Sequence, residues 1–111
     1  MRNLSDPKYV DGDFLAAVTA AGTTQGTATT LKSNHSLVTV VADGATGVIL
    51  KAYPPGEVFS VANGDAAQSL LVYPPSGAAF NGQTANDPIT LPVGFCAMGR
   101  VISNTVILVT F

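Results

Sequence analysis

Charged residues are scarce in this sequence. Asp, Glu, Lys and Arg make up 11% of its 111 residues, whereas about 25% is typical of soluble domains. An isolated monomer would therefore have few charges for its surface area, and we expect much of that surface to be buried in an assembly. The alternative is a soluble domain whose surface is simply rich in Ala, Gly and Thr.

Basic residues are too few and too dispersed to form a nucleic-acid binding patch. The formal net charge is −2, and the five basic residues are scattered singly along the chain without a run. Binding along a phosphate backbone requires clustered Lys and Arg. We therefore expect no nucleic-acid partner. The five residues are Arg2, Lys8, Lys32, Lys51 and Arg100.

Residues that carry catalytic chemistry are equally rare. The chain has one histidine, His35, and one glutamate, Glu57. A Ser/His/Asp or Cys/His device needs a base beside its nucleophile, and a zinc site usually needs three or four ligands. The Asp11-Gly12-Asp13 motif has a weak similarity to a calcium loop but lacks the downstream ligands. The sequence predicts a protein that is not an enzyme and binds no cofactor or metal.

The single cysteine, Cys96, lies in the apolar run from Phe95 to Met98, which favours a buried, inert thiol. With one cysteine, no disulfide can form within the chain. The longest run of low polarity, Phe14 to Ala21, is about half the ~20 residues that a membrane-spanning helix needs. We expect neither a signal peptide nor a membrane anchor.

The length fits one domain preceded by an arm. Residues 1–13 contain five of the twelve charged residues, together with Pro7 and Gly12, and show neither helical nor strand periodicity. We expect an extended N-terminal arm there that becomes ordered only against a neighbour, although a terminus without a role fits the residues equally well. Residues 14–111 are expected to form a single β domain.

Turn residues punctuate the domain about every ten positions, a spacing typical of all-β sandwiches and barrels. We expect a single compact sandwich or barrel, jelly-roll-like, of about eight short strands. The run Val106–Val109 predicts a C-terminal strand covered on both faces. The expected strands are Phe14–Ala20, Ser36–Val41, Val48–Ala52, Val58–Ala62, Ser69–Tyr73, Ile89–Leu91, Phe95–Ala97 with Arg100–Ile102, and Val106–Phe111.

Two further segments are distinctive. Gly22–Thr30 has two glycines and five threonines, which suits an exposed edge strand or a loop laid over a sheet. Tyr-Pro-Pro occurs twice, beginning at Tyr53 and Tyr73, and would place two rigid turns at comparable rims of the fold. A tripeptide echo of this kind does not by itself indicate a solenoid repeat.

The order of these patterns resembles a family of small virion proteins of tailed bacteriophages. The similar patterns include TxxGTTQGTATTL, DGATGVIL, LLVYPPSG and a final LPVG, and the resemblance covers roughly residues 19–95. It implies a capsid decoration, or cement, protein: a homo-oligomer, most often a trimer, that binds the major capsid protein, is made in the host cytoplasm and resides on the virion surface. The segments that carry it are Gly22–Leu31, Val38–Leu50, Val58–Asn63, Leu70–Gly77 and Phe80–Gly94.

Candidate contact residues follow from these readings. Extended segments can add strands to exposed sheet edges, so the arm and the Gly22–Thr30 segment are expected to contact the capsid or another subunit. The alternative function is a fibre or lectin-like module that binds cell-surface glycan at a shallow site beside the two Tyr-Pro-Pro turns. The candidate residues are Arg2, Lys8, Tyr9, Thr23, Thr24, Gln25, Thr27, Tyr53 and Tyr73.

Overall fold

The chain alternates between two facing β-sheets. The computed structural model describes residues 14–111, and none of these residues is helical, which confirms the all-β expectation; the expected arm, residues 1–13, lies outside them. The strands are β1 (Phe14–Thr19), β2 (Thr29–Thr30), β3 (His35–Val40), β4 (Gly47–Ile49), β5 (Val58–Asn63), β6 (Leu70–Tyr73), β7 (Ala79–Phe80), β8 (Ile89–Leu91), β9 (Cys96–Val101) and β10 (Val106–Thr110).

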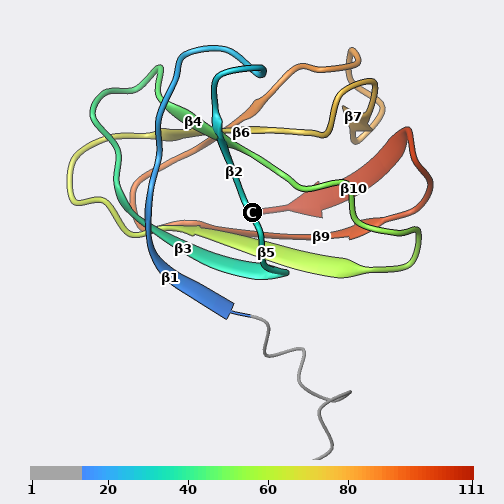
Figure 1. The fold of residues 1–111 in the computed structure, drawn as a ribbon, viewed down its shortest axis with the longest axis horizontal. Helices are drawn as coiled ribbons and strands as arrows, with labels where there is room; N and C mark the ends of the chain where they lie inside the picture. The colour runs from blue at the N-terminus through green and yellow to red at the C-terminus, as the bar shows by residue number, and fades with distance from the viewer. Residues whose placement is uncertain (1–13) are drawn as a thin grey trace, which may run out of the picture.

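The first six strands stack like the coils of a solenoid. Strands β1, β3 and β5 pair in parallel in one sheet, while β2, β4 and β6 pair in parallel in the other. Each coil therefore contributes one strand to each layer, and Figure 1 shows the layers nearly edge-on, with β3, β5 and β9 below and β4 and β6 above. Successive coils use the same two faces, so their apolar residues share one core.

The last four strands close this stack. Strand β8 pairs antiparallel with β6, and β9 pairs antiparallel with β5. Strand β10 then lies between β9, its antiparallel neighbour, and β7, its parallel neighbour. The result is a six-stranded sheet, β1-β3-β5-β9-β10-β7, and a four-stranded sheet, β2-β4-β6-β8.

This topology corrects two expectations. The two facing sheets agree with the expected compact sandwich, but its jelly-roll-like connectivity was wrong, because the first six strands stack as parallel coils. There are also ten strands among the described residues rather than about eight. The added strands, β2 and β7, have two residues each. Turn residues mark where a strand ends, but they do not determine whether the next strand returns beside it or crosses to the other sheet.

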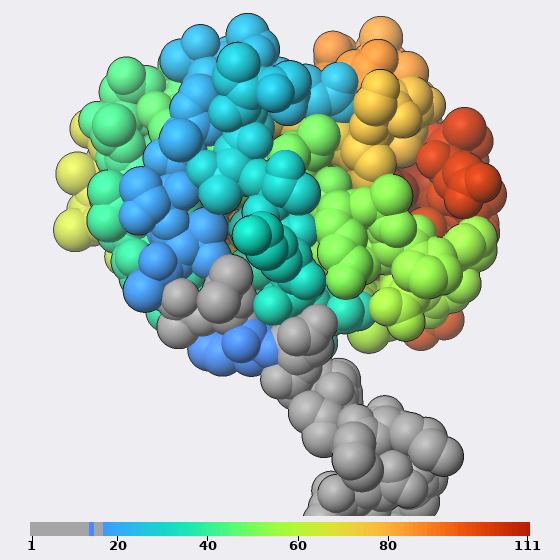
Figure 2. Space-filling view, in the orientation of Figure 1, coloured from blue at the N-terminus to red at the C-terminus, as the bar shows by residue number. Residues whose placement is uncertain are grey.

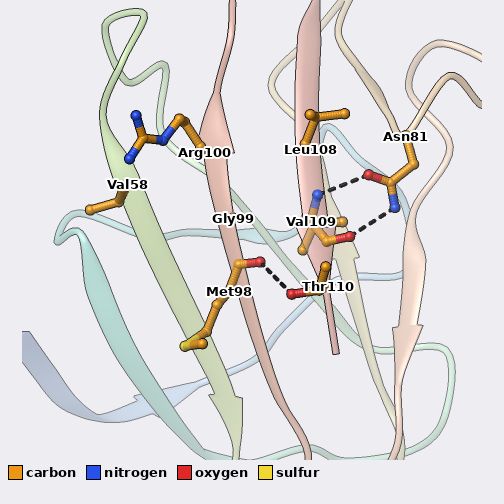
Figure 3. Close-up of a pocket in the computed structure, with 8 residues that line it drawn as sticks. All are labelled: Val58, Asn81, Met98, Gly99, Arg100, Leu108, Val109 and Thr110. Carbon is orange, nitrogen blue, oxygen red and sulfur yellow. Dashed lines mark hydrogen bonds between the residues drawn. The ribbon is translucent and has the colours of Figure 1, made fainter.

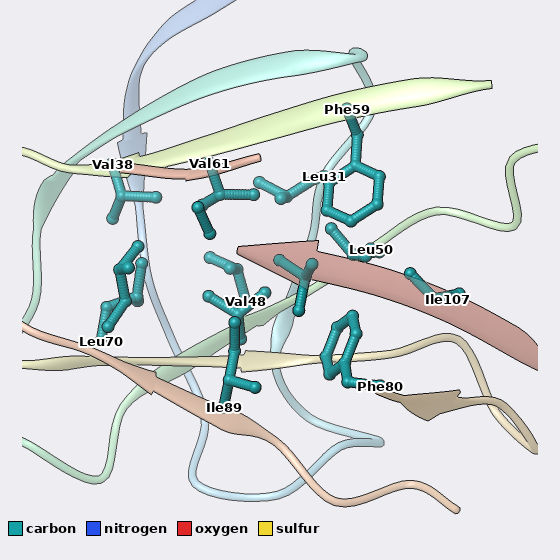
Figure 4. Close-up of a cluster of buried hydrophobic side chains, with 14 of the residues drawn as sticks. Leu31, Val38, Val48, Leu50, Phe59, Val61, Leu70, Phe80, Ile89 and Ile107 are labelled. Atoms are coloured by element: carbon teal, nitrogen blue, oxygen red, sulfur yellow. The ribbon is translucent and has the colours of Figure 1, made fainter. Parts of the chain in front are cut away.

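The core fills the space between the sheets with aliphatic and aromatic side chains. In Figure 4, Val38 and Val61 of the six-stranded sheet point toward Leu70 and Ile89 of the four-stranded sheet. The ring of Tyr53 is stacked parallel to that of Phe59 at 5.9 Å between centroids. The largest fully buried apolar side chains are Phe59, Phe80, Leu31, Leu50, Leu70, Leu91 and Ile107.

One glycine is required by this packing. Gly99 lies in the middle of β9, opposite Phe59 of β5 and Val109 of β10. A Cβ atom at Gly99 would lie 2.5 Å from the Phe59 ring and 2.5 Å from the carbonyl oxygen of Leu108. Phe59 therefore occupies the space that any other residue at position 99 would need. This explains how a glycine can sit inside a paired strand.

A buried asparagine and a loop aspartate hold the end of β5. The Asn63 amide nitrogen donates to the carbonyl oxygens of Gln68 and Leu91, and its Oδ1 accepts from the Asp65 backbone. The Asp65 carboxylate accepts hydrogen bonds from the backbone N–H groups of Ala67, Gln68 and Val41. These bonds tie the β5–β6 loop to the end of β3.

We expect Asp65 to make stability depend on acid pH. Hydrogen bonds from Ala67, Gln68 and Val41 lower the pKa of Asp65 below its ordinary value. A lowered folded-state pKa stabilises the fold above the unfolded value of about 3.9, and this contribution is lost as pH falls through the folded-state pKa. The melting temperature of the Asp65→Asn variant should therefore fall less steeply below about pH 4 than that of the wild type.

Asp87→Asn is the matched control, since Asp87 is an exposed turn residue. Melting temperatures measured by circular dichroism across the acid range would compare the three proteins. Identical acid profiles for the wild type and Asp65→Asn would show that the carboxylate does not couple to folding.

Candidate functional site

The outward side of the six-stranded sheet is an apolar surface. Strand register places five residues in one row across it, because each lies directly opposite the next on the neighbouring strand. Residues two positions along each strand lie on the same side. A second row therefore contains Val58, Arg100 and Leu108. The first row runs Phe14, His35, Ser60, Met98 and Thr110.

Large hydrophobic side chains are concentrated on this side. Six of the ten exposed large hydrophobic residues among the described positions lie there. Arg100 has the one formal charge among its outward-facing positions from Phe14 to Thr110. We call this surface the outer apolar face and define it by Phe14, Val58, Met98, Ile102, Val106 and Leu108, together with His35, Ser60, Cys96, Arg100 and Thr110.

A shallow hollow of about 630 Å³ lies in the outer apolar face. Figure 3 shows Val58 and Arg100 on one side of it and Leu108 on the other, with Met98 below. Its polar groups are few, with Asn81 and Thr110 at one margin. A mainly apolar lining with few polar groups is suited to binding another apolar surface.

Asn81 fixes the margin of this hollow. Its backbone has a φ of 51°, in the left-handed region where Asn is favoured. Its Oδ1 accepts from the Val109 N–H at 2.8 Å, and its Nδ2 donates to the Val109 carbonyl oxygen at 2.9 Å. Both bonds are drawn in Figure 3. The side-chain amide thus extends the pairing of β7 with β10 by one rung.

Cys96 lies on the outer apolar face, and the expectation of a buried thiol was wrong. Its side chain is exposed, because Cys96 and Met98 share one side of β9 while Ala97 fills the core. The apolar run Phe95–Met98 looks like core sequence. In the strand, its residues point alternately inward and outward, and the side chains on both sides are apolar.

The candidate residues of the Gly22–Thr30 segment form a surface loop held by the chain itself. Thr23, Thr24 and Thr27 are exposed, and Thr24 and Thr27 form a local turn through their side chains. The Gln25 amide donates to the carbonyl oxygen of Pro74, on the loop after β6, and to Asn86, on the loop after β7, which are 49 and 61 positions away. Figure 2 shows this loop, in blue to cyan, as part of the surface.

The two candidate tyrosines are buried. Tyr53 is 4% exposed and Tyr73 is 7% exposed. Their hydroxyl groups donate to the carbonyl oxygens of Ser33 and Thr23, respectively. This placement fits a packing role better than the expected contact with a partner. The remaining candidates, Arg2, Lys8 and Tyr9, lie outside the described residues.

The prolines that follow these tyrosines line a common cleft. A second cavity of about 290 Å³ lies between Pro54 and Pro75, although the tyrosines themselves are 20 positions apart. Its polar lining includes Ser76, Ser103 and Asn104. The repeated Tyr-Pro-Pro tripeptide therefore identified two turns that meet in space. The cleft between them is large enough for one sugar ring or one proline side chain.

One polar pair on the outer apolar face was not expected from the sequence. His35 Nδ1 lies 2.7 Å from the Ser60 hydroxyl. Nucleophilic catalysis by such a pair also needs a group that orients the histidine. The carboxylate of Glu57, the one glutamate, accepts instead from the Asn34 amide. His35 and Ser60 meet because β3 pairs in parallel with β5, and the sequence does not show the register of that pairing.

Within residues 14–111, no three His, Cys, Asp or Glu side chains are grouped in a way that could hold a metal ion. The same residues include no helix of the length and apolar character required to cross a membrane. Comparison of the whole chain with protein-family models, with curated proteins and with solved structures finds no match to any of them.

Proposed function

We propose that this protein is a structural component of a tailed-bacteriophage virion that decorates the capsid and stabilises it. The observation that carries the proposal is the outer apolar face, a broad sheet surface with several half-exposed hydrophobic side chains and one charge, Arg100. Patches of this kind mark surfaces that are covered in an assembly. The resemblance of residues 19–95 to decoration proteins supplies the virion as that assembly.

The mechanism is mass action. A protein that binds the assembled lattice, and not the separate subunits, stabilises the lattice by the free energy of that binding. Here the major capsid protein is the partner, and the decoration protein acts without catalysis as a homo-oligomer on the virion surface after synthesis in the host cytoplasm. Three copies is the number that the resemblance implies.

The exposed threonines of the 23–27 loop, together with Arg2, Lys8 and Tyr9, are the proposed capsid contacts. The loop is suited to this because its shape is fixed within the subunit by Gln25, so little ordering is required on binding. Charged residues near the N-terminus would contribute electrostatic attraction that salt weakens.

The test is to add purified protein to undecorated capsids and to image them by electron cryomicroscopy. The expected result is added density at three-fold or quasi-three-fold positions. A variant lacking residues 1–13 should stay folded and oligomeric but bind capsids more weakly. Full-length protein that leaves every capsid undecorated would refute the proposal.

A second candidate function is recognition of cell-surface glycan in the cleft between Pro54 and Pro75. The observation in its favour is the polar lining by Ser76, Ser103 and Asn104 beside rigid turns. Reproducible binding to defined glycans on an array, lost on Asn104→Ala, would favour this function. No binding to the glycan array, together with binding to capsids, would favour decoration.

A further inference from the structure

We propose that the outer apolar face is the surface through which copies of this chain bind one another. The inference concerns contact between copies and stands whether or not a capsid is the final partner. It assigns the half-exposed residues Val58, Met98 and Leu108 to the contact between subunits. Their exposed fractions in the single chain are 41%, 60% and 50%.

The C-terminal strand is the first argument. Strand β10 has hydrophobic residues at four consecutive positions, Val106 to Val109, a pattern typical of strands that are covered on both sides. Within one chain it is covered on one side: Ile107 and Val109 are buried, while Val106 and Leu108 are about half exposed. A neighbouring surface would complete the burial that the sequence pattern indicates.

The size of the face is the second argument. The face crosses five neighbouring strands, β1-β3-β5-β9-β10. At a spacing of about 4.8 Å these strands span about 19 Å, and a strand of six residues is about 20 Å long. Two such faces in contact cover about 800 Å² in projection, and their accessible area is larger because the side chains make the surface uneven. This approaches the ~1,000 Å² that a specific interface requires.

Charge placement is the third argument, because it permits contact with a second copy. A face with one sign of charge would repel its own copy if the charges met. Arg100 lies one row away from the central row that contains Met98, and rows are about 6.8 Å apart along a strand. In a face-to-face pairing whose two-fold axis crosses the strands at Met98, the two Arg100 positions would lie about 14 Å apart, beyond the Debye length of about 10 Å at 0.1 M salt.

A matched pair of lysine substitutions tests this assignment. Leu108 on the outer apolar face and Val40 at the end of β3, outside it, are equally exposed at 50% and 49%. Leu108→Lys should therefore perturb the fold no more than Val40→Lys, and thermal melting would verify this. In sedimentation velocity from about 1 to 100 µM, wild type and Val40→Lys should associate, and Leu108→Lys should raise the dissociation constant at least about tenfold.

The single thiol provides an independent readout. Cys96 is exposed on the outer apolar face, so its reaction with an aromatic disulfide reagent should slow as the concentration of wild-type protein rises. In Leu108→Lys the rate should not depend on concentration. The sedimentation mass gives the number of copies, which is two for a two-fold pairing of this face and differs from the three that the resemblance implies.

Three results would overturn the inference. The first is a wild-type protein that stays monomeric at 100 µM with a fully reactive Cys96. The second is equal weakening of association by Leu108→Lys and Val40→Lys, which would place the interface elsewhere. The third is a Cys96 protected at every concentration in a monomer, which would show that the chain covers its own face. A monomer that still decorates capsids would refute this inference and the homo-oligomer of the proposed function, but it would leave capsid decoration itself intact.

Discussion

Deleting residues 106–111 is expected to give a chain that does not fold. Strand β10 pairs with β9 on one side and with β7 on the other, so its loss leaves β7 without a strand partner and exposes the edge of β9 that β10 covered. It also removes Ile107 and Val109 from the core and both hydrogen bonds that hold Asn81. Losing two buried aliphatic side chains alone would cost several kcal/mol, a large part of the ~5–15 kcal/mol that a domain of this size has.

The measurement is the soluble yield of the truncated chain, followed by its circular dichroism spectrum and thermal transition. Removing Phe111 alone is the control, because this residue is 52% exposed and follows the strand. A truncated protein that stays soluble with an unchanged melting temperature would show that β10 is dispensable to the core.

Asn63→Ala is expected to be the most destabilising change at any polar residue of the described chain. Asn63 is 2% exposed, and its amide satisfies the carbonyl oxygens of Gln68 and Leu91 and the N–H of Asp65. Alanine leaves these three backbone groups without their partner. The bond to Leu91 is buried and the other two are part-buried. Since each unsatisfied buried group costs about 1–3 kcal/mol, a loss of about 2 kcal/mol or more in the free energy of unfolding is expected.

Chemical denaturation with a fluorescence or dichroism readout gives this quantity directly. Asn104→Ala is the control, since Asn104 is an exposed loop residue. A change below about 1 kcal/mol for Asn63→Ala would mean that water replaces the amide, and that the loop between β5 and β6 is open to solvent.

Most strand positions could be predicted from the sequence, but their arrangement could not. The expected Ile89–Leu91 agrees with β8, and Val58–Ala62 differs from β5 by one residue. The coils, however, have no constant period: Thr29 pairs with Val48, 19 positions on, whereas Val48 pairs with Val72, 24 positions on. Because the loops differ in length, the sequence shows no constant repeat even though the strands stack as regular coils in the structure.

The repeated Tyr-Pro-Pro tripeptide marks two turns that meet in space, but it does not mark the period of the coils. Tyr53 and Tyr73 occur in the same tripeptide, but Tyr73 pairs with Ile49, so the tyrosines are not at equivalent positions of successive coils. Both tyrosines were candidate contact residues because they lie beside rigid turns. Each is buried because its hydroxyl finds a backbone carbonyl to bind, a partner that the sequence cannot show.

The outer apolar face could not be located from the sequence because its strands are apolar on both sides. Where both sides of a strand are apolar, no alternation reveals which side faces the core. In β9, the sequence makes Cys96, Ala97 and Met98 look equally like core residues. Only the register with β5 and β10 shows that Ala97 faces the core while Cys96 and Met98 face outward. The scarcity of charge predicted that a covered surface exists but could not locate it.

The antiparallel closure of the stack also determines when the molecule can fold during synthesis. Strand β5 contacts β9, with Val58 opposite Arg100, so the centre of the larger sheet is incomplete until the last tenth of the chain has been made. Contacts so distant along the chain make folding slow, typically milliseconds to seconds for β proteins. The outer apolar face requires β9 and β10. Completion of the core and formation of this face therefore both wait until residue 110 has left the ribosome, so a shorter nascent chain does not yet display the outer apolar face.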